Sequence, residues 1–122
     1  MSQNQKYRKI SFYGNYFLDF VSKQSTDIQN KIYWTFEVIE DLWHVPDTYL
    51  KHIVNTNGLY EIRVQVGNYI VRIFCFFETG KLVILINGFQ KKTQKTPKKE
   101  IKLALKLKSE YEKQKPDDLR GA

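Results

Sequence analysis

Three runs of strand-forming residues follow one another between Gly58 and Thr96, and only two short turn sequences, Gly67-Asn68 and Thr79-Gly80, separate them. The runs are rich in Val, Ile, Tyr and Phe, which suit the pleated, half-buried surface of a sheet. Strands joined by such short turns pair antiparallel. This part of the chain therefore predicts three consecutive antiparallel strands.

A two-residue loop at Gly67-Asn68 also predicts the register of the first pair, with Val66 facing Tyr69 and Arg63 facing Arg72. Because side chains alternate along a strand, one face is apolar and should cover a core. That face holds Tyr60, Ile62, Val64, Val71, Ile73 and Cys75. The opposite face holds Glu61, Arg63, Gln65, Arg72 and Phe74.

The third run, returned through the second turn, places Asn87 opposite Arg72 and Phe89 farther along the same face. The chain then delivers Lys91 and Lys92 at the end of that strand. Like charges directly opposite one another destabilise a sheet by up to about 1 kcal/mol.

A face with two opposed arginines and a rim of lysines has no evident structural purpose, and an anionic ligand would supply one. The alternative is that Glu61 simply neutralises Arg63 on a solvated face.

The rest of the chain predicts one more strand and three helices. A strand is expected over residues 8–13 and a short helix over 16–23. A longer helix, capped by Ser25-Thr26-Asp27, should run to about Trp43. Thr96-Pro97 should start a last helix that ends near Lys113. The predicted order strand, helix, helix, three strands, helix gives an α+β fold, with helices on one face of a small antiparallel sheet.

Helical spacing predicts which side chains of the two long helices are buried. In the first, the apolar stripe holds Ile28, Ile32, Phe36, Ile39 and Trp43, and both Trp34 and Trp43 are expected in the core or in a seam between helices. In the last helix the expected packing side holds Ile101, Ala104, Leu105 and Tyr111. Its expected basic stripe holds Lys99, Lys102, Lys106 and Lys113.

The chain of 122 residues is long enough for one domain, expected over 1–122 with an ordered core of about 8–113 and a frayed C-terminal tail. Its net charge of +7 is concentrated at one end, since residues 91–120 hold eleven Lys/Arg and five Asp/Glu. A basic end is typical of a protein that binds nucleic acid, another polyanion or an acidic protein, and the alternative, which composition alone slightly favours, is a charged helix that is simply solvated. The absence of a long apolar run argues against a membrane span, and the N-terminus lacks the features of a signal peptide. The single cysteine, Cys75, is expected to be buried and fits a cytoplasmic protein.

The chain lacks a Ser-His-Asp triad, a Walker loop, a GxGxxG fingerprint and a CxxC pair. The spacing of His44, His52 and Cys75 does not suit a zinc site. What remains is a cluster of cations that can bind phosphate and stabilise charge developing on phosphorus, namely Arg63, Arg72, Lys91 and Lys92. Crowding by cations can also lower the pKa of a lysine, which would let it act as a base. Basic residues beside the aromatic rings of Phe74 and Phe89 fit stacked single-stranded RNA.

Three segments carry a family resemblance: GLYEIRV, YIVRIF and INGFQKKTQKTPKKEI, of which the GFQKKTQKTP run is the most specific. Over about residues 8–113 the chain resembles the HigB-like, phage-derived branch of the RelE/ParE toxin superfamily. The resemblance implies a toxin of a type II toxin–antitoxin system that cleaves mRNA in the ribosomal A site. It implies attack of the ribose 2′-hydroxyl on the neighbouring phosphate without metal or other cofactor. It also implies a cognate antitoxin, often a helix-turn-helix protein, through which the complex would contact DNA.

Position by position, the resemblance implies that Arg63, Arg72, Lys91 and Lys92 are catalytic. The residues expected to bind RNA around them are Glu61, Phe74, Asn87, Phe89, Lys95, Lys99, Lys102 and Lys106. Many relatives have histidine where this chain has Asn87, so a potential acid/base group is missing. A lysine or the ribosome itself could serve instead.

Two alternatives remain. A ParE-like relative would poison DNA gyrase by binding, on the same fold. A non-catalytic nucleic-acid-binding module would use the basic stripe as its whole functional surface, and its binding would weaken steeply with salt.

Overall fold

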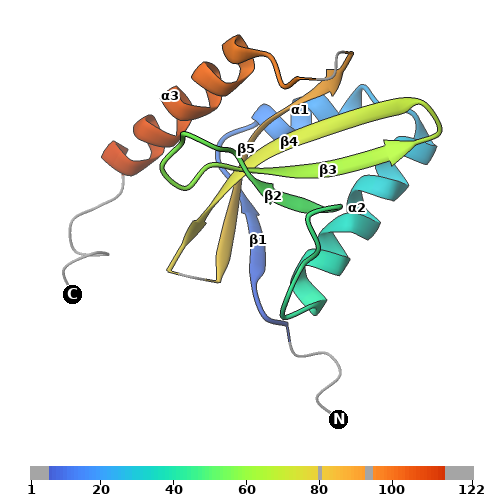
Figure 1. Ribbon diagram of the computed structural model, residues 1–122, viewed down its shortest axis with the longest axis horizontal. Coiled ribbons are helices and arrows are strands. Elements are labelled where there is room, and N and C mark those ends of the chain that lie inside the picture. The colour runs from blue at the N-terminus through green and yellow to red at the C-terminus, as the bar shows by residue number, and fades with distance from the viewer. Residues whose placement is uncertain (1–5, 80, 93–94, 115–122) are drawn as a thin grey trace.

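The computed structural model describes residues 6–79, 81–92 and 95–114 (Figure 1). The predicted frayed tail at 115–122 and the N-terminal residues 1–5 lie outside this part, as do Gly80 and residues 93–94. The elements in chain order are β1 (Lys9–Phe12), α1 (Tyr16–Ser22), α2 (Thr26–Asp41), β2 (Leu50–His52), β3 (Tyr60–Val66), β4 (Tyr69–Glu78), β5 (Leu82–Lys91) and α3 (Lys98–Gln114). No helix in the described ranges has the length and apolar character needed to cross a bilayer.

The five strands form one mixed sheet in the order β1-β5-β4-β3-β2. The predicted α+β class is confirmed, but the prediction of a purely antiparallel sheet is wrong, because β1 pairs with β5 in parallel. The three-residue strand β2 was not predicted and pairs antiparallel with the start of β3. It is too short to show an alternating pattern, so sequence periodicity gives no signal for it.

The predicted register between β3 and β4 is confirmed along its whole length. Val66 pairs with Tyr69 and Arg63 pairs with Arg72. The two-residue loop sets this register, and the left-handed φ of +58° at Gly67 is one that glycine adopts without strain.

The predicted register between β4 and β5 is wrong by two residues. Phe89, rather than Asn87, lies opposite Arg72, and Asn87 lies opposite Phe74. One residue of the shift comes from the turn, since pairing resumes between Glu78 and Leu82, and the other from an irregularity beside Phe74 and Cys75. Beyond the irregularity the shift amounts to two residues, so Asn87 and Phe89 keep their predicted face.

Helices cover both faces of the sheet, so the prediction that they share one face is wrong (Figure 1). The first core lies between the sheet and helices α1 and α2, and it includes Phe17, Ile32 and Ile39. The second lies between the opposite face and α3, and its helical members include Ala104 and Leu107. Cys75 is buried, as predicted.

Three predictions of side-chain burial are wrong. Trp43 is 73% exposed and Trp34 is 43% exposed, because α2 ends at Asp41 and Trp34 lies away from the sheet-facing stripe. Leu105 is also exposed, and Leu107 takes its place against the sheet. The stripe of Ile28, Ile32, Phe36 and Ile39 is buried, and the Ser25 hydroxyl caps α2 by accepting a hydrogen bond from the backbone N–H of Ile28.

Candidate active site

Two arginines from the central part of the sheet form the centre of the site. Arg63 on β3 and Arg72 on β4 are directly paired, so their side chains leave the same face. Arg72 is only 7% exposed, and its Nη1 donates to the carbonyl of Val71 at 3.2 Å. Arg63 is more open, and its Nη1 donates to the carbonyl of Asp47 at 3.3 Å. Both guanidinium groups therefore project from paired strands, which hold them more rigidly than a loop would.

A buried carboxylate lies between the two arginines. Oε2 of Glu61 is 3.5 Å from Nε of Arg63 and 3.7 Å from Nε of Arg72. The other oxygen, Oε1, accepts a hydrogen bond from the hydroxyl of Thr96 at 3.2 Å. Glu61 is 6% exposed, so its charge acts in a partly desolvated setting where ion pairing is strong. It compensates two like charges that would otherwise repel each other across the strand pair.

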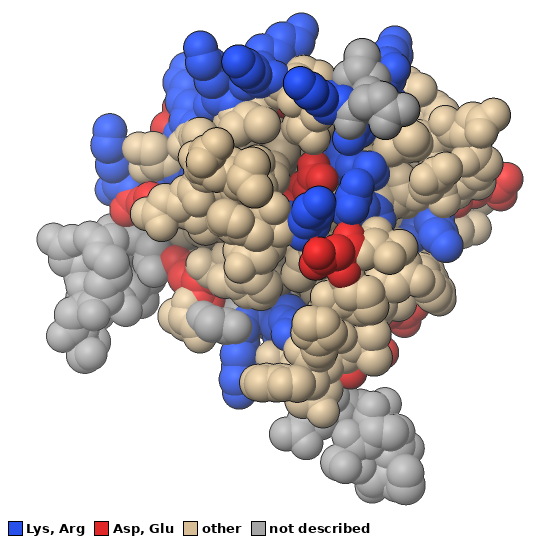
Figure 2. Space-filling model, viewed as in Figure 1, with Lys and Arg blue, Asp and Glu red and all other residues tan. Residues whose placement is uncertain are grey.

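The four cations predicted to be catalytic line one cavity of about 620 Å³. Asn68, Ile70 and Gln90 complete its wall, and none of the described residues that line it is acidic. Lys91 pairs with Ile70 in the register of β4 and β5, at the end of the strand that lies beside Arg72. In Figure 2, basic and acidic groups lie next to one another near the centre of the visible face. The structure thus brings Arg63, Arg72, Lys91 and Lys92 together around a space that can take a phosphate.

The surroundings shift the pKa values of two of these cations. Burial lowers the pKa of Arg72, the nearby charge of Arg63 lowers it further, and Glu61 opposes both effects. Burial also lowers the pKa of Lys91, and the positive charges of Arg72, Arg63 and Lys51 add to this, again against Glu61. Lys91 therefore gives up its proton more readily than a free lysine.

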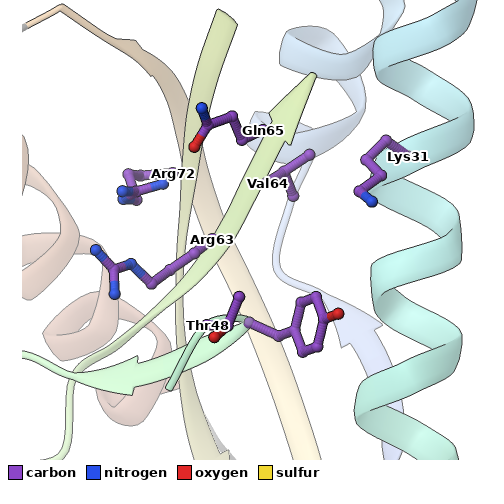
Figure 3. Close-up of a pocket in the computed structure, with 7 residues that line it drawn as sticks. Lys31, Thr48, Arg63, Val64, Gln65 and Arg72 are labelled. Carbon is purple, nitrogen blue, oxygen red and sulfur yellow. The ribbon is translucent and has the colours of Figure 1, made fainter. Parts of the chain in front are cut away.

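A second cavity of about 390 Å³ shares both arginines with the first. Its other lining residues are Lys31, Thr48, Tyr49, Val64 and Gln65 (Figure 3). Figure 3 shows Lys31 on the side of α2 that faces β3, with Arg63 and Gln65 projecting from β3 itself. Sequence reasoning did not single out Lys31, Thr48, Tyr49 or Thr96 as site residues. These four come from a helix and from loops that only the tertiary fold brings to the arginines, so no local pattern could have found them.

Three other residues expected to contact RNA lie in or against the second core. Phe74 is fully buried, so the expectation that it offers an exposed stacking surface is wrong. It stacks instead on Phe89, with ring centroids 5.5 Å apart, and Phe89 is partly buried against the same core. Asn87 is 6% exposed, and neither atom of its amide has a hydrogen-bond partner among the described residues. The packing of α3 onto this face accounts for the burial.

The expected basic stripe lies on the surface. Lys99, Lys102 and Lys106 are exposed on α3, and Lys95 is exposed just before it. Basic groups gather over this part of the molecule in Figure 2. None of these four lysines lines either cavity. Their position suits long-range attraction of a polyanion more than contact with a reacting phosphate.

Comparison with known protein families identifies a relationship over most of the chain. A family model described as phage-derived protein Gp49-like matches residues 19–109, a span that includes all four cations of the first cavity. No curated protein matches the chain.

Proposed function

Because the chain belongs to the phage-derived Gp49-like family, a family of RelE/HigB-like toxins of toxin–antitoxin systems, we propose that it is a ribosome-dependent mRNA endoribonuclease. The observation that carries the proposal is the convergence of Arg63, Arg72, Lys91 and Lys92 on one cavity. Four cations around a cavity that has no acidic residue in its described lining are suited to a phosphodiester whose negative charge grows during reaction.

In the proposed reaction the ribose 2′-oxygen attacks the adjacent phosphorus while the bond from phosphorus to the 5′-oxygen breaks. The products are a 2′,3′-cyclic phosphate and a free 5′-hydroxyl. One proton leaves the 2′-hydroxyl and one is delivered to the departing 5′-oxygen, so the step needs neither water nor an oxidant. The 2′-hydroxyl is what makes RNA, and not DNA, the substrate.

The arginines have the role of stabilising the transition state. A guanidinium can donate two parallel hydrogen bonds to phosphate oxygens, and such charge-assisted bonds are about twice as strong as neutral ones. Glu61 lies on the Nε side of both arginines and so holds their position. Glu61 thus acts as a positioning residue, and we assign it no direct contact with RNA.

Proton transfer is assigned to Lys91. Its lowered pKa favours a neutral amine more than in an ordinary lysine, and it lies on the same cavity as both arginines. Asn87 cannot take this part, because an amide does not titrate and its side chain is buried. The role proposed for the ribosome is to position the message, while Lys91 carries the proton.

The proposed partners are the ribosome with its mRNA and a cognate antitoxin. Membership in a toxin–antitoxin family supports an antitoxin, and we propose a helix-turn-helix protein through which the complex contacts DNA. Such a partner would neutralise the toxin by denying RNA access to the cationic cavity.

The test compares three forms of the protein expressed without antitoxin: wild type, Arg72→Ala and Arg72→Lys. We expect wild type to arrest growth and to leave translated messages cut within the reading frame. Loss of one transition-state donor should lower cleavage by a factor of about 100 or more in Arg72→Ala. Arg72→Lys keeps a positive charge beside Glu61 but loses the two-pronged contact, so it should fold and remain nearly inactive.

Lys9→Ala is the matched control, because Lys9 is exposed on the edge strand β1 and lines neither cavity. Circular dichroism of each variant shows whether it is folded. Undiminished toxicity of folded Arg72→Ala would contradict the proposal. A rapid DNA-damage response with intact messages would favour the gyrase-binding alternative.

A further inference from the structure

The second cavity lies beside an open stretch of strand edge. Strand β2 covers β3 only up to the pair Leu50 and Ile62, and beyond it the N–H of Arg63 bonds to the carbonyl of Tyr49 at 2.8 Å. Because backbone groups alternate in direction along a strand, those of Gln65 point to the same side as those of Arg63, past the end of β2. The cavity therefore lies beside the part of β3 that extends past the end of β2.

The lining of this cavity combines cations with groups that can read a base. Its cations are Lys31, Arg63 and Arg72, and among the described residues that line it none is acidic. Thr48 contributes a hydroxyl and Gln65 an amide, which are the side-chain groups that hydrogen-bond base edges.

An aromatic pair supports the same wall. Tyr49 packs edge-on against Trp34, with ring centroids 5.6 Å apart, and Nζ of Lys31 lies 4.4 Å from the Trp34 ring centroid. The contact with Trp34 holds both Lys31 and Tyr49 in place. A phenol ring fixed beside a lysine suits a stacked base with its phosphate close by.

The volume of the second cavity and its connection to the first indicate which ligand it can hold. A volume of about 390 Å³ is within the range of sites for small molecules. Both arginines also line the larger cavity. A single polynucleotide could thus place its reacting phosphate in the larger cavity and an adjoining nucleotide in the smaller one. We infer that the second cavity binds the nucleotide next to the scissile phosphate, and that Lys31, Tyr49 and Gln65 set the sequence preference of cleavage. This inference rests on the proposed function.

Binding can be tested apart from cleavage. Short RNA oligonucleotides with 2′-O-methyl riboses cannot be cut, and their binding to the purified protein is followed by amide chemical shifts and by titration. We expect shifts at Thr48, Tyr49, Val64 and Gln65 in addition to those around Lys91. Lys31→Ala should weaken binding about tenfold, equivalent to one good charged contact, whereas Lys9→Ala should leave it unchanged.

Cleavage gives the second readout. Mapping the 5′ ends of cut messages in cells should show that Gln65→Ala and Thr48→Ala redistribute the cleavage sites among sequence contexts, with total cleavage reduced less than by Arg72→Ala. Active variants with an unchanged distribution, together with amide shifts confined to the surroundings of Lys91, would overturn the inference and leave the proposed function standing.

The reverse outcome is also distinguishable. If RNA binds in the second cavity but is not cut in the presence of ribosomes, the proposed function is wrong and the cavity remains an RNA-binding site. An acidic protein segment could instead pair with the open edge of β3. If Lys31→Ala weakens neutralisation of the protein by its antitoxin while RNA binding stays at the wild-type level, the cavity belongs to the antitoxin. That result would overturn the inference.

Discussion

At the scale of single residues, the main feature of the site is the repulsion between two paired arginines and its compensation by one carboxylate. Arg63 and Arg72 face each other, which is unfavourable in a sheet. Glu61 is within 3.7 Å of Nε in both, and Thr96 fixes the other side of its carboxylate. The two interpretations drawn from the sequence are thus compatible, because neutralisation by Glu61 coexists with an open cavity beside the arginines.

Lys91 provides a prediction about pH. Burial and neighbouring cations disfavour its charged form, so its pKa is lower in the folded protein than in the unfolded chain. Between these two pKa values the unfolded chain binds more protons, and the free energy of unfolding contributed by Lys91 therefore rises with pH in that window. Below the window Lys91 destabilises the fold, and Lys91→Met should be more stable than wild type at neutral pH.

The measurement is urea unfolding of wild type and Lys91→Met between about pH 7 and about pH 10. The stability advantage of the variant should shrink as the pH rises, while its cleavage of RNA should be lost throughout. A constant difference across this range would show that Lys91 titrates alike in both states.

Much at this scale could be predicted, and the rest depends on packing. Loop length was enough to place Arg63 opposite Arg72. The burial of Phe74, however, follows from α3 covering that face, which no spacing along β4 reveals. Thr96 was predicted to start the last helix, yet α3 begins only at Lys98 and the Thr96 hydroxyl donates a hydrogen bond to Glu61.

At the scale of elements, α3 divides one face of the sheet into a buried part and an open part. Part of the face is a second core beneath α3, and part is the cationic site. All three helices are amphipathic. The hydrophobic pattern of a helix indicates which of its sides is buried, but it does not indicate which face of the sheet the helix covers. That is why the order of the elements other than β2 was predictable from the sequence and the layering was not.

The second core can be tested with two leucines of the same helix. Leu107 is 3% exposed and packs on the sheet, whereas Leu105 is 37% exposed. We expect Leu107→Ala to lower the free energy of unfolding by about 3 kcal/mol, from reduced burial and the cavity left behind. Leu105→Ala should change it by less than about 1 kcal/mol. Chemical denaturation measures both, and equal effects of the two variants would contradict the placement of α3.

At the scale of the whole molecule, the positive charge lies in two separate places. The cavities hold the cations that would touch the reacting part of the RNA, and the exposed lysines of α3 form a separate basic surface. Such a surface attracts a polyanion and adds affinity that depends on salt rather than on sequence.

Salt dependence can separate these two contributions. For the double variant Lys102→Ala and Lys106→Ala, the slope of log binding constant against log salt should become shallower by about 0.7 for each phosphate that the variant no longer neutralises. The affinity should fall without a change in the cleavage pattern, and Lys9→Ala should retain the wild-type slope. Titrations of uncleavable single-stranded RNA at several salt concentrations measure this. A cleavage defect as severe as that of Arg72→Ala would make α3 part of the catalytic apparatus.

The pairing of β3 with β4 has a last consequence for how the protein becomes active. A slip of one residue between these strands would turn one guanidinium toward the wrong side of the sheet and bury a charge among apolar side chains. Both guanidinium groups therefore reach the cationic cavity only when the hairpin has closed in its native register. The two-residue turn at Gly67-Asn68 sets that register, so inserting a residue there should lower the proposed RNA cleavage more than it lowers the free energy of unfolding.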